Sequence, residues 1–187
     1  MKNKRIILAS ASPRRKKLLK KIITDFEVIT SGVDESKIQL SSPDEFAVSA
    51  AILKAKEVAL QLSNAIVIGA DTIVVLKDKI LGKPSSKKDA IYMLKSLSDT
   101  IHQVITGIAL VDADTLEVKS DFEITKIKMK KLDEKEIIEY VDTGKPLDKA
   151  GAYGIQEIED PFIEWIDGDY DNVVGLPVEK LKRLLCF

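Results

Sequence analysis

The order of apolar and polar positions along the chain predicts alternating strands and helices early and mostly strands in the middle. A buried first strand is predicted at residues 5–9, of which residues 6–9 are apolar, and the continuous apolar run at residues 65–70 is typical of a strand buried on both faces. Further strands are predicted at residues 26–31, 72–76, 80–81, 103–111, 116–129, 152–158 and 162–166. The second and third of these flank a polar turn and predict a hairpin.

Helix starts are marked by side chains that can accept from the free N–H groups of a first turn. Ser12 followed by Pro13 predicts the first helix, and the capping box at residues 42–45 predicts a long helix through about residue 62. Further helices are predicted at residues 86–97, 133–144 and 176–185. The order predicts one α/β domain over residues 1–187, with a mixed, partly antiparallel sheet flanked by helices, two lobes and a central cleft.

Composition excludes several classes of protein. Hydrophobic residues make up 45% of the 187 residues, enough for a folded core, and the formal net charge of −1 disfavours bulk binding to nucleic acid or an anionic membrane. The single cysteine, Cys186, excludes an internal disulfide, and the single histidine, His102, excludes a multi-histidine metal site. No apolar run approaches the roughly 20 residues that span a bilayer. Because neither a signal segment nor a disulfide is indicated, we expect a cytoplasmic protein.

The loop after the first strand carries a candidate anion site. It reads Ser10-Ala11-Ser12-Pro13-Arg14-Arg15, and only four arginines occur beside 25 lysines. A helix N-terminus attracts anions, and arginine offers a planar fork for phosphate. Capping by Ser12 explains the Ser-Pro pair but not the adjacent arginines, which oppose the helix dipole. The loop therefore predicts a phosphate-type ligand.

Three further segments carry candidate charged groups. Asp71 follows the apolar run of residues 65–70, where a carboxylate can hold Mg²⁺ or act as a general base; the alternative is a turn aspartate that binds nearby N–H groups. Lys83, between Gly82 and Pro84, could reach a phosphate or be an exposed loop lysine. Glu35 lies after Gly32 and could be a third functional carboxylate or part of a solvated turn.

Residues 146–156 could face a nucleotide base. Small residues surround Tyr153, and Lys149 and Gln156 lie nearby. The Gln156 amide could read a base edge, whereas for Tyr153 alone a place in the core is favoured. No serine near His102 fits a nucleophile elbow, so a structural, hydrogen-bonded histidine is expected there.

Together these motifs resemble the Maf family of nucleoside triphosphate pyrophosphatases. The matching stretches run in order over nearly the whole chain, at residues 8–15, 31–35, 69–72, 81–84, 102–107, 148–156 and 173–177. One departure is Ser98-Asp99, where the family usually has Ser-Gly. The resemblance implies a Maf/Ham1-like fold and a hydrolase that cleaves between the α and β phosphates, releasing pyrophosphate.

The resemblance also implies residue roles. Asp71 would be the proton acceptor, Lys54 and Lys83 catalytic cations beside the phosphates, and Glu35 with Asp71 the ligands of a divalent cation, Mg²⁺ or alternatively Mn²⁺. Substrate contacts and specificity are implied for Ser10, Arg14, Arg15, Thr72, Lys149 and Gln156.

Residues 148–156 resemble the dTTP- and UTP-selective branch, with modified pyrimidine triphosphates as further candidates. The alternatives are the 7-methyl-GTP branch of the same family and a non-catalytic nucleotide-binding regulator of cell division. A nucleic-acid-binding module that uses residues 14–17 is disfavoured by the balanced charge and the lack of an aromatic platform. No membrane partner is expected, and a homodimer stays open.

Overall fold

The computed structural model describes residues 4–35, 38, 42–155 and 162–186. The strands are β1 (Arg5–Leu8), β2 (Glu27–Val28), β3 (Ala65–Leu76), β4 (Lys79–Leu81), β5 (Ile101–Asp112), β6 (Val118–Met129) and β7 (Ile163–Asp167). The helices are α1 (Pro13–Leu19), α2 (Pro43–Ala59), α3 (Lys87–Leu97), α4 (Glu134–Asp142), α5 (Tyr170–Val174) and α6 (Val178–Leu185), with 3₁₀ turns η2 (Lys145–Asp148) and η3 (Ala150–Ala152). None of the helices in these ranges is long and apolar enough to cross a membrane.

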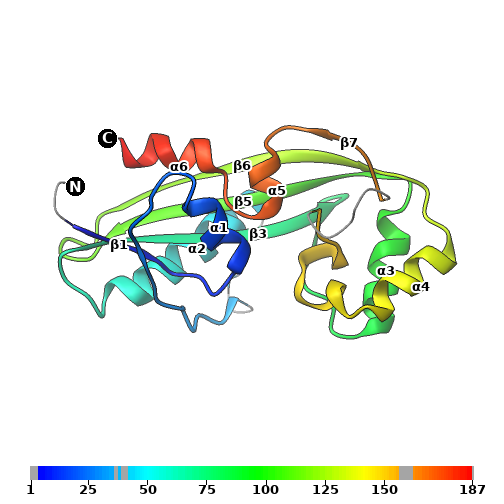
Figure 1. Ribbon diagram of the computed structural model, residues 1–187, viewed down its shortest axis with the longest axis horizontal. Coiled ribbons are helices and arrows are strands. Elements are labelled where there is room, and N and C mark those ends of the chain that lie inside the picture. The colour runs from blue at the N-terminus through cyan, green and yellow to red at the C-terminus, as the bar shows by residue number, and fades with distance from the viewer. Residues whose placement is uncertain (1–3, 36–37, 39–41, 156–161, 187) are drawn as a thin grey trace.

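All seven strands belong to one sheet, in the order β2-β1-β3-β5-β6-β7, with β4 paired to β3. The pairs β1/β2 and β1/β3 are parallel, and the other pairs are antiparallel. The long strands β3, β5 and β6 form its centre (Figure 1). The predicted mixed sheet flanked by helices is therefore confirmed.

One edge of β3 is open over residues 69–73, a stretch that we call the notch. Strand β1 pairs with β3 only as far as Ile68, and β4 pairs with it only from Val74 onward. Between these points, β3 is paired in the described part of the chain only with β5, on its other edge. Successive side chains of a strand point to opposite faces, so side chains from both faces of the sheet lie beside this open edge.

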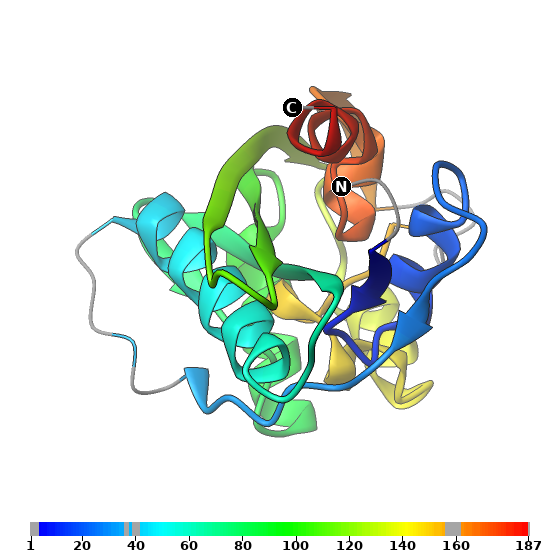
Figure 2. The same cartoon turned by 90° about the vertical axis from the view of Figure 1, so that its left-hand side faces the viewer.

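Helix α2 covers one face of the sheet at very close range (Figure 2). A Cβ atom added at Gly69 would lie 2.1 Å from the Ala51 carbonyl oxygen, and one added at Gly107 would lie 2.3 Å from that of Ala47. Glycine on the strands and alanine on the helix therefore allow this approach, which no larger residue at Gly69 or Gly107 would permit without displacing the helix. The contact brings the polar residues of α2 to the edge of β3.

The opposite face carries two groups of helices (Figure 1). Helices α1 and α6 pack over the end of the sheet that contains Ile68 and Leu110, where the buried Leu19 and Leu181 join one core. Helices α3 and α4 pack over the other end, around Val104. The notch lies between these two groups.

Several elements differ from the sequence prediction. Asp71 does not end a strand: β3 continues through it to Leu76. The strand predicted at residues 152–158 is wrong for its described part, because Ala152 completes a 3₁₀ turn and both Gly151 and Ala152 have positive φ. Helix α5 was not predicted, although Asp169 caps it by accepting from the Asp171 N–H.

Candidate active site

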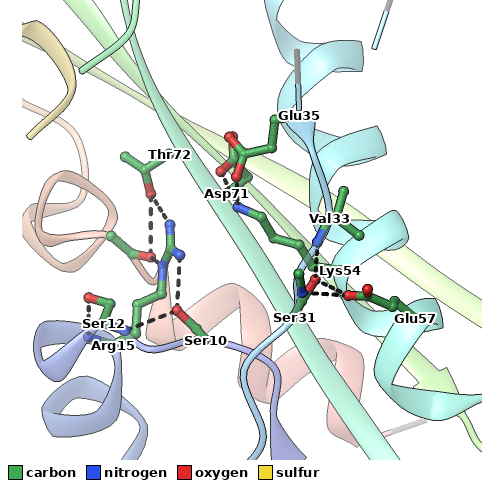
Figure 3. Close-up of polar contacts among 12 residues, drawn as sticks. Ser10, Ser12, Arg15, Ser31, Val33, Glu35, Lys54, Glu57, Asp71 and Thr72 are labelled. Atoms are coloured by element: carbon green, nitrogen blue, oxygen red, sulfur yellow. Dashed lines mark hydrogen bonds and ion pairs between the residues drawn. The ribbon is translucent and has the colours of Figure 1, made fainter. Parts of the chain in front are cut away.

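A cavity of about 640 Å³ opens at the notch. Its lining comes from the loop before α1, from β3, and from η2, η3 and the end of α5. Figure 3 shows two groups of polar side chains on the two sides of β3, one around Asp71 and one around Thr72. The alternation of side chains along the open edge of β3 gives one cavity access to both groups.

On the α2 side, two carboxylates meet one lysine. Lys54 Nζ lies 2.7 Å from Asp71 Oδ1 and 2.5 Å from Glu35 Oε1. The Asp71 side chain is 8% exposed and that of Lys54 13%, whereas Glu35 is more open to solvent. The second carboxylate oxygen of Asp71, Oδ2, is buried and has no hydrogen-bond partner among the described residues. Buried carboxylate oxygens are normally satisfied, so Oδ2 is an acceptor that the described residues leave without a donor.

Glu57 was missed by the sequence analysis, and it anchors the loop that carries Glu35. It lies one helical turn after Lys54, and its Oε2 accepts from the Ser31 hydroxyl at 2.5 Å and from the Gly32 N–H at 2.7 Å. The Ser31 hydroxyl in turn accepts from the Val33 N–H at 3.1 Å (Figure 3). An acidic residue on a helix gives no local signal of this role, because the partner segment is 25 residues away.

On the other side of β3, Arg15 connects three separate segments. Its Nε donates to the Gly175 carbonyl at 2.8 Å, Nη1 to the Ser10 hydroxyl at 3.2 Å and Nη2 to the Thr72 hydroxyl at 2.9 Å. Desolvation lowers the pKa of the guanidinium, while the nearby Asp71 and Glu35 carboxylates act in the opposite direction. Arg15 therefore positions the site's own residues, and a guanidinium with five N–H groups keeps donors for a phosphate as well.

The N-terminus of α1 faces the same cavity. The Ser12 hydroxyl caps the helix by accepting from the Arg15 N–H at 3.4 Å, as predicted, and the Ser10 hydroxyl accepts from the Ser12 N–H at 3.3 Å. Arg14 extends toward Asp148, with Nη1 and Oδ2 3.7 Å apart. The unfavourable position of the two arginines at the start of the helix is thus partly compensated. Arg15 donates to a carbonyl and two hydroxyls, and Arg14 lies near the carboxylate of Asp148.

The remaining predicted residues are placed in different ways. Lys83 is exposed and lines the cavity. Its loop is held to η3 by a hydrogen bond in which the Gly151 N–H donates to the Gly82 carbonyl at 3.0 Å. Lys149 also lines the cavity but is 5% exposed, and its ammonium donates to Asp148 Oδ1 at 2.6 Å and to the Lys145 carbonyl. Gln156 lies outside the described residues, so its role stays a prediction.

Tyr153, which lines the cavity, and His102 form a buried pair. The Tyr153 hydroxyl lies 2.6 Å from His102 Nε2, and the two residues are 5% and 2% exposed. Burial lowers the pKa of His102 to about 4, so the imidazole is neutral at pH 7, and it raises the pKa of Tyr153. The expected structural histidine and core tyrosine are confirmed, although Tyr153 also lines the cavity.

The two carboxylates at the notch are too few to form a metal site by themselves. They fit a divalent cation whose other ligands are waters and substrate phosphates. Within the described ranges, no group of three or more His, Cys, Asp or Glu residues could hold a metal ion. Glu35 and Asp71 nevertheless converge, and Asp71 Oδ2 is unpaired. Mg²⁺ usually takes one or two carboxylates and completes its coordination with waters and substrate phosphates, which this pair would allow.

Comparison with known proteins gives a consistent result. A family model described as Maf-like protein matches residues 5–186. A dTTP/UTP pyrophosphatase of Thermoanaerobacter sp. strain X514 is 49% identical, covering 97% of this chain and 95% of the relative. A dTTP/UTP pyrophosphatase of Acetivibrio thermocellus is 48% identical, covering 97% and 94%.

The solved structure of a HAM1 protein from Coxiella burnetii superimposes with a TM-score of 0.53 and 18% identity, covering 98% of each chain. At that identity the likeness concerns the fold alone, and it confirms the Ham1-like architecture that the sequence predicted.

Proposed function

The chain belongs to the Maf family, and on that premise we propose that it is a pyrophosphatase that hydrolyses dTTP and UTP to the monophosphate and pyrophosphate. Relatives at 47–49% identity over nearly the full chain carry that name. The observation that carries the proposal is the unpaired, buried Oδ2 of Asp71 in a cavity lined by lysine and arginine.

In this proposal, Asp71 is the general base. One carboxylate oxygen is held by Lys54 at 2.7 Å, which leaves Oδ2 free to accept a proton from water. The water oxygen forms a bond to the α-phosphorus while the bond between that phosphorus and the α–β bridging oxygen breaks. Its proton passes to Asp71 Oδ2, and the electron pair of the broken bond leaves with pyrophosphate.

The cations of the cavity stabilise the charge that develops on the phosphate oxygens. Lys54 contacts Asp71, the exposed Lys83 lines the same cavity, and Arg14 and Arg15 lie at the N-terminus of α1. Fixed cations in a partly dry site lower the energy of a charged transition state, because they need no reorganisation when the charge appears.

Charge on the phosphates is further neutralised by a divalent cation, Mg²⁺ or alternatively Mn²⁺, when one is bound at Glu35 and Asp71. The protein's own contribution there is to hold Glu35 near Asp71, through Lys54 and through the Glu57 contacts to residues 31–33.

Selection of the base is assigned to Arg14, Thr72 and Gln156, with Lys149 as a further group on the cavity wall. Supporting this, Arg14 on α1 and Thr72 on β3 both line the cavity, and Thr72 presents a hydroxyl at the notch. A glutamine amide offers one donor and one acceptor, which suits the O4 and N3–H pattern shared by thymine and uracil.

A product analysis tests this proposal. Purified protein is incubated with Mg²⁺ and, in separate reactions, with dTTP, UTP, CTP and 7-methyl-GTP. We expect UMP or dTMP with one equivalent of pyrophosphate, and turnover about 10²–10⁴-fold lower in Asp71→Asn. Release of orthophosphate with the nucleoside diphosphate, or preference for 7-methyl-GTP, would contradict the proposal. Binding of nucleotide without any product would favour a non-catalytic regulator.

A further inference from the structure

A second threonine lies behind Thr72 and does not face the cavity. Thr106, on β5, is paired in register with Thr72 on β3 and is 0% exposed. Its Oγ1 lies 3.0 Å from Thr72 Oγ1 and donates to the Asn172 carbonyl at 3.0 Å. The most direct route from Thr106 to a ligand in the cavity is therefore the Thr72 hydroxyl.

The directions of these hydrogen bonds follow from counting hydrogens. A threonine hydroxyl has one hydrogen and two lone pairs. Since Thr106 gives its hydrogen to the Asn172 carbonyl, it accepts from Thr72, so the single hydrogen of Thr72 is used within the protein. The other described acceptor near Thr72, the Gly175 carbonyl, lies 3.5 Å away and already accepts from Arg15 Nε at 2.8 Å.

One lone pair of Thr72 is used as well. Arg15 Nη2 donates to Thr72 Oγ1 at 2.9 Å, which leaves a single lone pair for a ligand. The Asn172 carbonyl that orients Thr106 is itself fixed, since the Asn172 side-chain amide donates to the Val104 carbonyl at 3.1 Å and to the Thr125 hydroxyl at 2.9 Å. The orientation is thus built into buried structure before any ligand binds.

We propose that Thr106 is a positioning residue that makes the Thr72 hydroxyl an acceptor only, so that the cavity favours the imide N3–H of uracil and thymine over the bare N3 of cytosine. This rests on the proposed function, because it concerns how the same cavity chooses its pyrimidine. A hydroxyl held as an acceptor gains a hydrogen bond from N3–H and faces lone-pair repulsion from the cytosine nitrogen.

The test compares Thr106→Val with Thr106→Ser. Valine has nearly the shape of threonine but cannot accept, so the Thr72 hydrogen becomes free to turn toward the ligand. Serine keeps the hydroxyl. Affinities for the non-hydrolysable α,β-methylene analogues of UTP and CTP are measured by calorimetry, and the thermal stability of each variant is measured alongside.

We expect the wild-type protein to prefer the UTP analogue, and Thr106→Val to reduce that preference about tenfold, the size of one net hydrogen bond. Thr106→Ser should keep it. The effects of Thr106→Val and Thr72→Val on the preference should not add in the double variant, because both act through the Thr72 hydroxyl. A loss of packing alone would weaken both analogues equally and leave their ratio unchanged.

An unchanged ratio in Thr106→Val, or equal affinities in the wild-type protein, would overturn the proposal. If the valine variant does not fold, Thr106→Cys, whose sulfur accepts only weakly, should reduce the preference too. Because the readout is binding, it is separate from catalysis: a wild-type protein that binds the UTP analogue selectively but releases no pyrophosphate would refute the pyrophosphatase and leave the role of Thr106 standing.

Discussion

Acidification should destabilise this protein through its single histidine. His102 is 2% exposed, and its Nδ1 is buried without a hydrogen-bond partner among the described residues. Its other ring nitrogen faces the Tyr153 hydroxyl at 2.6 Å. Protonation would place a charge in this apolar surrounding, and for that reason burial lowers the pKa of His102 from 6.5 to about 4.

The direction and size of the effect follow from proton linkage. Because the pKa is lower in the folded state, the unfolded chain binds more protons between pH 6.5 and about 4. The contribution of His102 to the free energy of unfolding is therefore fully present above about pH 6.5, and it is lost as the pH decreases through that window. Between about pH 7.5 and about pH 5 the loss amounts to roughly 2 kcal/mol.

Urea unfolding at these two pH values measures the loss, and His102→Gln is the matched control because glutamine does not titrate. Carboxylates contribute to acid destabilisation in both proteins. The contribution of His102 is therefore the difference between the losses of unfolding free energy in the wild-type protein and in the variant. We expect the wild-type protein to lose roughly 2 kcal/mol more than the variant over this range. Equal losses would show that His102 is not held neutral by burial, and the reasoning would fail.

Three further predictions, at Asp71, at the two arginines and at Glu57, test the site. Asp71→Asn should lower turnover about 10²–10⁴-fold with little change in thermal stability, and near wild-type turnover would remove Asp71 as the general base. Arg15→Ala should destabilise the ligand-free protein by about 2–4 kcal/mol in thermal or urea unfolding, because three hydrogen bonds are lost, whereas Arg14→Ala should change stability by less than about 0.5 kcal/mol. Glu57→Ala should raise the Mg²⁺ concentration needed for half-maximal activity about tenfold, and Glu57→Gln should not; equal behaviour of the two would contradict the anchoring role.

Much of the fold was predictable because local chemistry and tertiary structure agree. The Ser12 and Ser42 caps lie where the sequence placed them, and the helix predicted from residue 133 begins there with a capping box of Asp133 and Glu136. The prediction failed where an unusual backbone conformation, and not the pattern of apolar residues, determines the secondary structure. Gly151 and Ala152 adopt positive φ and form a 3₁₀ turn, although the apolar residues that follow resemble a strand. At Asp99 the chain also has positive φ, which aspartate tolerates better than most residues, so the departure from glycine there keeps the turn.

The candidate site was predictable where its residues lie in one motif and unpredictable where the fold brings segments together. The sequence singled out Asp71 and Arg15, and the structure places both on the cavity. It gave no reason to connect Glu57 with residues 31–33, or Thr106 with Thr72, because these contacts depend on strand register and on the close approach of α2. The sequence also interpreted Arg15 as a phosphate ligand alone, whereas the structure gives it partners in three segments.

The notch explains why chemistry is located at this one point of β3. A strand paired on both edges would bury its backbone and separate Asp71 from Thr72 by the thickness of the sheet. Because β1 stops opposite Ile68 and β4 begins opposite Val74, one ligand can reach the carboxylate on the α2 face and the hydroxyl on the α1 face together. In the proposed reaction, cleavage and base selection then fall on consecutive residues whose side chains point in opposite directions. A shift of pairing by one residue would exchange their faces and remove Asp71 from Lys54, so the register of β3 with β1 and β5 is itself a requirement of the proposed reaction.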